Sequence, residues 1–185
     1  MTQLIPSTRQ LILVTGATRS GKSQWAETLA QKLNKPVIYV ATALENPDDP
    51  EWQSRIAQHQ KRRPPDWETH CIPYDLSAIL DSIKSPHCLL IDSLGTWVAN
   101  SLEQDNDTWK EITDQLLENL QKTPLDIIMV AEETGWGVVP AYPLGRTFRD
   151  RLGSLIRQIG AIANPVYLVT GGHALNLSLI GELLP

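Results

Sequence analysis

The residues best suited to chemistry form a glycine-containing loop near the start of the sequence. Residues 16–23 read GATRSGKS, the pattern G-x-x-x-x-G-K-S, between an apolar run and a helical pattern. The two glycines let backbone N–H groups face phosphate oxygens, and the N-terminus of the next helix adds a favourable partial charge. Lys22 is placed to reach the β and γ phosphates, and the Ser23 hydroxyl to bind Mg²⁺. The residues expected to bind nucleotide here are Gly16, Ala17, Thr18, Arg19, Ser20, Gly21, Lys22 and Ser23.

A second candidate for metal chemistry is Asp92, which ends the apolar run CLLID. An acidic residue at this place is the usual partner of a P-loop magnesium ion, directly or through water. The same aspartate could instead cap the following helix. Residues 92–95 also fit the D-x-x-G of regulatory GTPases, but the guanine-reading N-K-x-D is absent, since Asn34 and Lys35 precede Pro-Val. The pattern therefore disfavours a switch GTPase.

His59 is the third candidate. It shares one face of a predicted helix over 51–61 with two apolar residues, so it could simply pack there. Arg55 lies one turn before it, and Arg62 and Arg63 follow it closely. Nearby cations disfavour the imidazolium form, and a neutral imidazole beside a bound triphosphate is a usable nucleophile toward phosphorus. The arginines would neutralise the phosphate oxygens.

The other histidines and the cysteines give no metal signal. His70, His87 and His173 lack metal-ligand spacing, and we expect them to be structural. Cys71 and Cys88 form no Cys-x-x-Cys pair, which argues against a zinc site and against a disulfide framework.

The elements that must position these residues alternate along the chain. Nearly continuous apolar runs predict strands buried on both faces, at 11–16, 36–42, 87–93, 126–132 and 165–171. Helical patterns lie at 22–33, 51–61, 75–84, 94–101, 108–122 and 144–163. The alternation predicts an α/β sandwich with a mostly parallel sheet. The stretch HALNLSLIGELLP near the C-terminus could add an antiparallel edge strand.

Length and composition limit the class of protein. A chain of 185 residues is expected to form a single domain over residues 1–185. A net charge of −5 disfavours general binding of nucleic acid. The first residues lack the apolar region of a signal peptide, and no apolar run approaches the length of a membrane span. We expect a cytoplasmic protein without a membrane span.

Five segments together resemble one enzyme family over nearly the whole chain. They read GATRSGKSQWAE, VIYVATA, RIAQHQKRRPPDWET, LLIDSLGTWVAN and EETGWGVVPAYPLGRTFRD. The chain is similar to the bifunctional adenosylcobinamide kinase / adenosylcobinamide-phosphate guanylyltransferase family of cobalamin biosynthesis. The resemblance implies a RecA-like P-loop fold, a homotrimer, and two reactions. A kinase phosphorylates adenosylcobinamide with ATP or GTP, and a transferase moves GMP from GTP onto the product through a guanylyl group on histidine.

The resemblance also assigns site residues. The guanylylated histidine is His59, beside Lys22 as the catalytic lysine, and Ser23 and Asp92 are the Mg²⁺ ligands. Nucleotide binding extends beyond the loop to Thr42, Ala43, Leu44, Arg62, Arg63, Pro64, Pro65 and Asp92.

The glycine-rich block after the fourth run, which opens a helix, is expected to contact the corrinoid or a phosphate. Its candidates are Glu133, Trp136, Arg146 and Arg149. The chain departs from the family pattern at Cys71, Ser93, Glu132 and 153–157.

Two other functions stay open on the sequence alone. One is a small-molecule kinase of the same fold, in which His59 is structural and no covalent GMP forms. The other is a nucleotide-dependent switch or partner-binding module, which predicts slow hydrolysis and a loop change on loss of the γ-phosphate.

Overall fold

One twisted sheet organises the residues that the structure describes, 9–44, 48–84 and 86–184 of this computed structural model. The described strands lie in the order β3-β2-β4-β5-β1-β6-β7. Neighbouring strands are parallel except for β6 and β7, which are antiparallel. The strands are β1 (Leu11–Gly16), β2 (Val37–Ala41), β3 (Glu68–Cys71), β4 (Cys88–Asp92), β5 (Asp126–Glu132), β6 (Val166–Thr170) and β7 (His173–Asn176).

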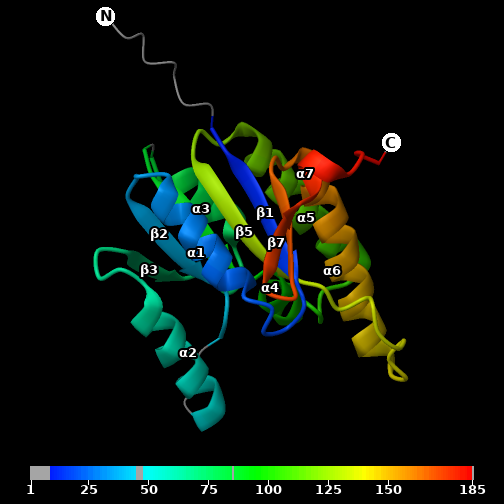
Figure 1. The fold of residues 1–185 in the computed structure, drawn as a ribbon. Helices are drawn as coiled ribbons and strands as arrows, with labels where there is room; N and C mark the ends of the chain where they lie inside the picture. The colour runs from blue at the N-terminus through cyan, green and yellow to red at the C-terminus, as the bar shows by residue number, and fades with distance from the viewer. Residues whose placement is uncertain (1–8, 45–47, 85, 185) are drawn as a thin grey trace, which may run out of the picture.

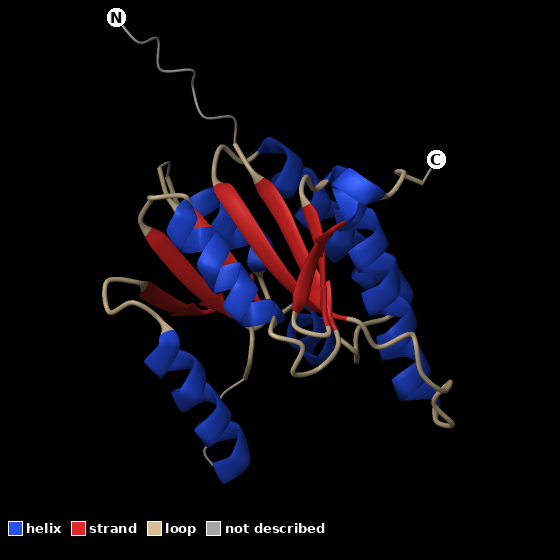
Figure 2. Ribbon diagram, in the orientation of Figure 1, coloured by secondary structure: helices blue, strands red, loops and turns tan. Residues whose placement is uncertain are grey.

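Helices cover both faces of the sheet (Figures 1 and 2). The helices are α1 (Lys22–Lys32), α2 (Pro50–Arg62), α3 (Leu76–Ser82), α4 (Leu94–Asn100), α5 (Asn106–Lys122), α6 (Pro143–Ile162) and α7 (Leu177–Ile180). Apolar residues of α1 pack on one face, and those of α3, α4, α5 and α6 pack on the other. The result is a three-layer α/β sandwich. None of the helices in the described ranges is long and apolar enough to cross a membrane.

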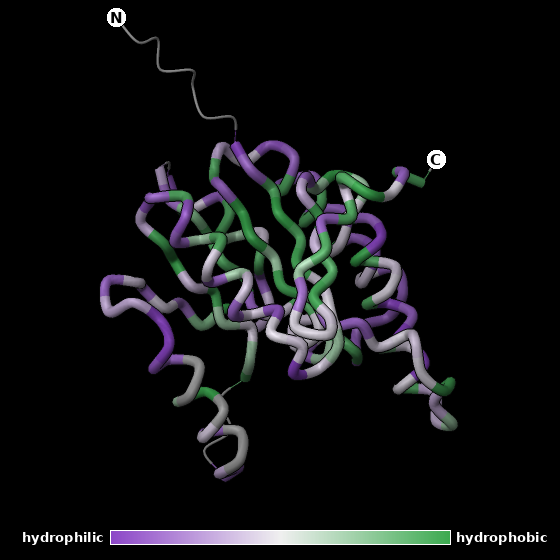
Figure 3. Tube along the Cα trace, viewed as in Figure 1, coloured by the Kyte–Doolittle hydropathy of each residue, from purple (hydrophilic) through white to green (hydrophobic). Residues whose placement is uncertain are grey.

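The apolar strand runs are explained by this double coverage. Side chains alternate between the faces of a strand, so a strand between two helical layers must be apolar throughout. In β1, Leu11 and Leu13 join the core cluster beneath α3–α6, whereas Ile12 and Val14 join the cluster beneath α1. Figure 3 shows the same pattern as hydrophobic central strands inside more hydrophilic outer segments.

The predicted elements are confirmed to within two residues at each end, including the antiparallel edge strand, which is β7. Two short elements were not expected from the sequence. Strand β3 has the sequence ETHC and is mostly exposed at the sheet edge, so it lacks an apolar pattern. Helix α7 has four residues, none of them buried.

Helix α2 differs from the others in its position. Figure 1 shows it projecting away from the sheet, with its C-terminal end nearer the body of the molecule. It follows β2 and leads into the turn before β3. The carboxyl ends of β1, β2, β4 and β5 meet at one edge of the sheet, because these strands are parallel. That edge carries the candidate site.

Candidate active site

The predicted phosphate loop has the backbone that such a loop requires. Strand β1 ends at Gly16, where a side-chain carbon would lie 2.7 Å from the Ser20 hydroxyl oxygen and closer still to the Val169 carbonyl oxygen. Gly21 has φ 95° and Arg19 has φ 60°, both in the left-handed region. Helix α1 then begins, with the Trp25 N–H donating to the Gly21 carbonyl at 2.9 Å. The loop is thus a tight turn placed ahead of a helix N-terminus.

Lys22 lies over this loop. Its side chain is largely buried, and its ammonium group donates to the Ala17 carbonyl at 3.4 Å. The same nitrogen lies 3.9 Å from Glu132 Oε1, at the end of β5. Gly16 and Glu132 are register partners on neighbouring strands, which is why the lysine and the carboxylate meet. The cation is therefore held at the loop by one carbonyl and one carboxylate.

Asp92 ends β4 at the same edge and is held by a tyrosine. The Tyr39 hydroxyl of β2 donates to Asp92 Oδ2 at 3.0 Å. Burial, followed by the charge of Asp92, raises the pKa of Tyr39, so this phenol stays protonated and keeps donating. The second carboxylate oxygen of Asp92 has no such bond to Tyr39. A carboxylate and a hydroxyl are hard oxygen donors of the kind that Mg²⁺ takes, so Asp92 and Ser23 could hold that ion, and their assignment as its ligands stays a prediction.

Glu132 is the least expected group in the site. Its Oε2 accepts the Gly95 N–H at 2.9 Å, at the start of α4. Burial raises the pKa of Glu132, while the charge of Lys22 opposes the shift. The neighbouring Glu133 accepts a hydrogen bond from the Thr15 hydroxyl at 2.6 Å. Within the described ranges, no group of three His, Cys, Asp or Glu side chains is arranged as a metal site.

Thr42 connects the ends of β2 and β4. Its hydroxyl donates to the Ser93 carbonyl at 2.7 Å and accepts the Ser93 N–H at 2.9 Å, and its side chain is fully buried. Ala43 and Leu44 follow it, and the Leu44 side chain is 46% exposed. A role for Thr42 in nucleotide binding stays a prediction, and its described hydroxyl contacts are structural.

The C-terminal end of α2 is joined to the same site. Arg62 donates to the buried Glu27 carboxylate of α1 at 3.2 Å. The Arg63 guanidinium lies 3.7 Å above the Tyr39 ring centroid and donates to Thr69 Oγ1 at 2.9 Å. Pro64 and Pro65 form the turn that follows, closed by the Trp67 N–H on the Pro64 carbonyl at 3.2 Å.

His59 lies on α2, one turn before Arg62. Its side chain is outside the residues that the structure describes, and so are the side chains of Trp52 and Arg55 on the same helix. Its assignment as the guanylylated residue stays a prediction.

The glycine-rich block divides into two parts. Glu133 lies at the P-loop edge, whereas Trp136 is 73% exposed on a loop that projects from the body of the molecule (Figure 1). Arg146 donates to the carbonyls of Pro140 at 3.1 Å and Ala141 at 2.7 Å, so it fastens its own loop. On α6, the Arg149 Nε atom lies 3.7 Å from Asp150 Oδ1.

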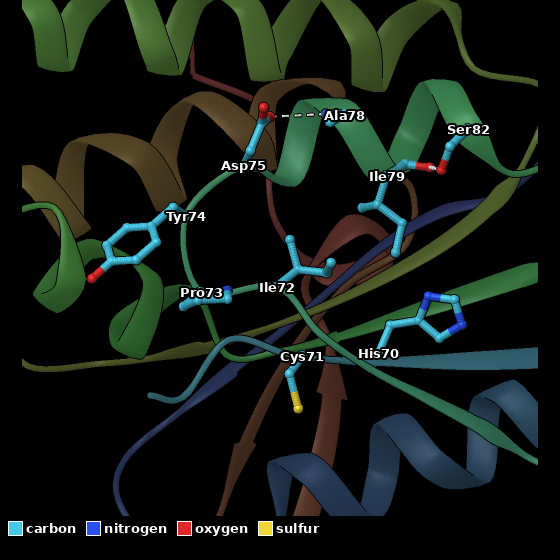
Figure 4. Close-up of a pocket in the computed structure, with 9 residues that line it drawn as sticks. All are labelled: His70, Cys71, Ile72, Pro73, Tyr74, Asp75, Ala78, Ile79 and Ser82. Carbon is cyan, nitrogen blue, oxygen red and sulfur yellow. Dashed lines mark hydrogen bonds between the residues drawn. The ribbon is translucent and has the colours of Figure 1, made fainter. Parts of the chain in front are cut away.

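A hollow of about 430 Å³ lies beyond the carboxyl end of β3, between that strand and α3 (Figure 4). Figure 4 shows the side chains of Ile72 and Ile79 facing this space, while the Cys71 sulfur points away from them. Asp75 accepts the Ala78 N–H at 2.9 Å, and this bond caps α3. The hollow was not expected from the sequence, because it depends on the unpredicted strand β3.

Comparisons with known proteins agree with this architecture. A family model described as cobinamide kinase / cobinamide phosphate guanyltransferase matches residues 12–177. The bifunctional adenosylcobalamin biosynthesis protein CobP of Pseudomonas aeruginosa is 40% identical over 174 residues, covering 93% of this chain and 98% of that protein. The bifunctional adenosylcobalamin biosynthesis protein CobU of Escherichia coli K12 is 34% identical over 177 residues, covering 88% and 96%.

Solved structures share the fold at low identity. A Pyrococcus horikoshii OT3 protein superposes with a TM-score of 0.55 at 6% identity, over 91% of this chain and 85% of that chain. An ATPase of the type III secretion system of pathogenic bacteria gives a TM-score of 0.50 at 12% identity, over 92% and 53%. These likenesses bear on the fold alone. The predicted three-layer α/β sandwich, with a mostly parallel sheet and an antiparallel edge strand near the C-terminus, is confirmed.

Proposed function

Because the chain belongs to the cobinamide kinase / cobinamide phosphate guanyltransferase family, we propose that both reactions use the P-loop edge of the sheet. The kinase reaction moves a γ-phosphoryl group from a nucleoside triphosphate to the hydroxyl of adenosylcobinamide. The transferase reaction then joins GMP from GTP to that phosphate. The observation that carries the proposal is the buried Lys22 at a loop of P-loop geometry, with Asp92 on a nearby strand.

In the kinase step, the loop N–H groups and Lys22 bind the triphosphate. Ser23 and Asp92 would hold Mg²⁺, which when bound shields the charge of the β and γ phosphates. The triphosphate takes the place of Glu132, 3.9 Å away, as the partner of the Lys22 ammonium group. The substrate hydroxyl oxygen forms a bond to the γ-phosphorus as the bond to the bridging oxygen breaks, and the hydroxyl proton is released. Positioning of the reactants and stabilisation of the charge on the transferred phosphoryl group supply most of the rate enhancement.

In the transferase step, we propose that a ring nitrogen of His59 attacks the α-phosphorus of GTP and pyrophosphate leaves. A phosphate oxygen of adenosylcobinamide phosphate then attacks the same phosphorus, which forms adenosylcobinamide-GDP and frees the histidine. Support comes from the attachment of α2, since Arg62 binds Glu27 on the P-loop helix α1. Arg62, Arg63, Pro64 and Pro65, together with Thr42, Ala43 and Leu44, are the further nucleotide contacts that we propose.

For the corrinoid, we propose Glu133, Trp136, Arg146 and Arg149. The exposed indole of Trp136 offers a flat apolar surface, and Glu133 lies at the P-loop edge. We also propose that the whole chain is one domain, that the enzyme is a cytoplasmic homotrimer, and that it has no nucleic-acid partner. The trimer rests on the family resemblance, and light scattering of the pure protein tests it.

The experiment that tests the function is a product assay. Pure protein is incubated with adenosylcobinamide, Mg²⁺ and either ATP or GTP, and the corrinoids are separated by chromatography. The wild type should yield the phosphate with ATP and the GDP adduct with GTP. Lys22→Met should abolish both products, whereas His59→Ala should stop at the phosphate. A His59→Ala enzyme that makes the GDP adduct at the wild-type rate would refute the role of His59.

A further inference from the structure

The point at which α2 joins the body of the molecule lies close to His59. Arg62 and Arg63 follow that histidine by three and four residues, and the rise of a helix places Arg62 about 4.5 Å farther along the axis. The N-terminal end of α2 projects away from the sheet (Figure 1). Contacts at Arg62 and Arg63 are therefore well placed to fix the position of the histidine.

Glu27 provides the first of these contacts. It follows Ser23 by four residues on α1, so both lie on the same face of the P-loop helix. Its side chain is only 7% exposed, and it binds Arg62 at 3.2 Å. A buried carboxylate requires a cationic or hydrogen-bonding partner, which gives the pair a strong preference for this arrangement.

Tyr39 provides the second contact and also binds Asp92, the carboxylate that we assign to Mg²⁺. Its ring lies beneath the Arg63 guanidinium at 3.7 Å, and its hydroxyl donates to Asp92 at 3.0 Å. One buried side chain thus touches both Arg63, the residue that directly follows the helix carrying His59, and the carboxylate that we assign to Mg²⁺. Its two contacts use different parts of the side chain, so substitution can separate them.

We propose that Glu27 and Tyr39 are positioning residues for guanylyl transfer, which set His59 relative to the P-loop by holding the C-terminal end of α2. This inference rests on the proposed role of His59. In-line attack requires the nucleophile within about 3.5 Å of phosphorus, and a displacement of about 1 Å lowers such rates by about 100-fold. The kinase step in this proposal needs no nucleophile on α2, so its rate should depend much less on the position of that helix.

The test measures the rate at which the protein acquires label from α-labelled GTP at saturating GTP and Mg²⁺. Glu27→Gln should lower this rate about 10- to 100-fold while the kinase rate changes less than about twofold. Arg62→Met should lower the labelling rate at least as much, because it removes the ion pair with Glu27 and also a proposed nucleotide contact, so its kinase rate is not the control. Once Arg62 is absent, adding Glu27→Gln should slow labelling no further. Glu118→Gln, which removes an exposed ion pair with Lys122 on α5, is the matched control and should leave both rates unchanged.

Tyr39 is tested by two substitutions with different contacts. Tyr39→Phe keeps the ring beneath Arg63 and loses the bond to Asp92, whereas Tyr39→Leu loses both. Their kinase rates should be alike, but guanylylation by Tyr39→Leu should be about tenfold slower than by Tyr39→Phe. The kinase rate reports whether each variant is folded, and if Tyr39→Leu does not fold, the Glu27 and Arg62 series decides alone.

The outcomes separate this inference from the function on which it rests. A wild type that acquires no label overturns both. A wild type that is labelled, with Glu27→Gln labelled equally fast, overturns the positioning role alone. Faster labelling of Glu27→Gln also overturns the positioning role, since Arg62 would then act only on phosphate. A parallel loss of kinase activity would show that Glu27 merely supports the P-loop helix.

Discussion

Alanine at Gly16 should damage the P-loop more than alanine at Gly21 or Gly153. Its side-chain carbon would lie 2.7 Å from the Ser20 hydroxyl oxygen, 0.7 Å inside the 3.4 Å at which ordinary contact begins, and nearer still to the Val169 carbonyl. That carbonyl belongs to strand β6, which pairs with β1, so it cannot move without distorting the sheet. Such overpacking lowers the free energy of unfolding by about 1–3 kcal/mol.

Two matched substitutions separate crowding from backbone strain. Gly21→Ala meets open space, with the nearest atom at 4.0 Å, but its φ of 95° should cost about 1–2 kcal/mol. Gly153→Ala, on the exposed face of α6 with no atom within 4 Å of the new carbon, should raise stability by about 0.5–1 kcal/mol. In a domain of this length each kcal/mol shifts Tm by about 2–4 °C.

Thermal unfolding with and without Mg-ATP measures both stability and binding. The wild type should gain about 2.7 kcal/mol at a nucleotide concentration 100 times Kd. Gly16→Ala should have a lower Tm than the wild type and a much smaller shift with nucleotide, whereas Gly153→Ala should keep the full shift. A Gly16→Ala variant with wild-type Tm and wild-type nucleotide shift would refute the steric reasoning.

Two further predictions concern Glu132 and the loop that Arg146 holds. Burial raises the pKa of Glu132, so its ionised form destabilises the folded protein as pH rises through that pKa. Glu132→Gln should therefore have a higher free energy of unfolding than the wild type at pH 8. The difference should vanish below about pH 4, where glutamate is protonated in the unfolded chain as well. Urea titrations at both pH values measure this, and equal stability of the two proteins at pH 8 would contradict it. Arg146→Ala removes the hydrogen bonds to the Pro140 and Ala141 carbonyls and should make limited proteolysis of that loop several-fold faster. The free energy of unfolding should change by less than about 1 kcal/mol. An unchanged cleavage rate would show that other contacts hold the loop.

The parts of the site that the sequence predicted share one property, a local pattern with a local cause. Gly16, Gly21 and Lys22 follow from the spacing of a loop that must turn between a strand and a helix. Asp92 follows from its place at the end of a buried strand. The core strands follow from continuous apolar runs, because each is covered on both faces.

The parts that could not be predicted depend on contacts between distant segments. Tyr39 reaches Asp92 across 53 positions, and Glu27 reaches Arg62 across 35. The sequence offers one weak indication for Tyr39, because its side chain carries a polar hydroxyl within the otherwise apolar run VIYVA. Glu132 was visible as a departure from the family pattern, yet its contact with Lys22 depends on the register of β1 and β5.

The central claim is that His59 carries GMP in the course of the reaction. The most direct measurement incubates the pure protein with α-labelled GTP and Mg²⁺, beside His59→Ala, followed by denaturation. We predict label that survives denaturation, is lost in acid, is stable in base and is absent from the variant. A wild type without label, with phosphorylation of adenosylcobinamide intact, would contradict the account and leave a kinase alone.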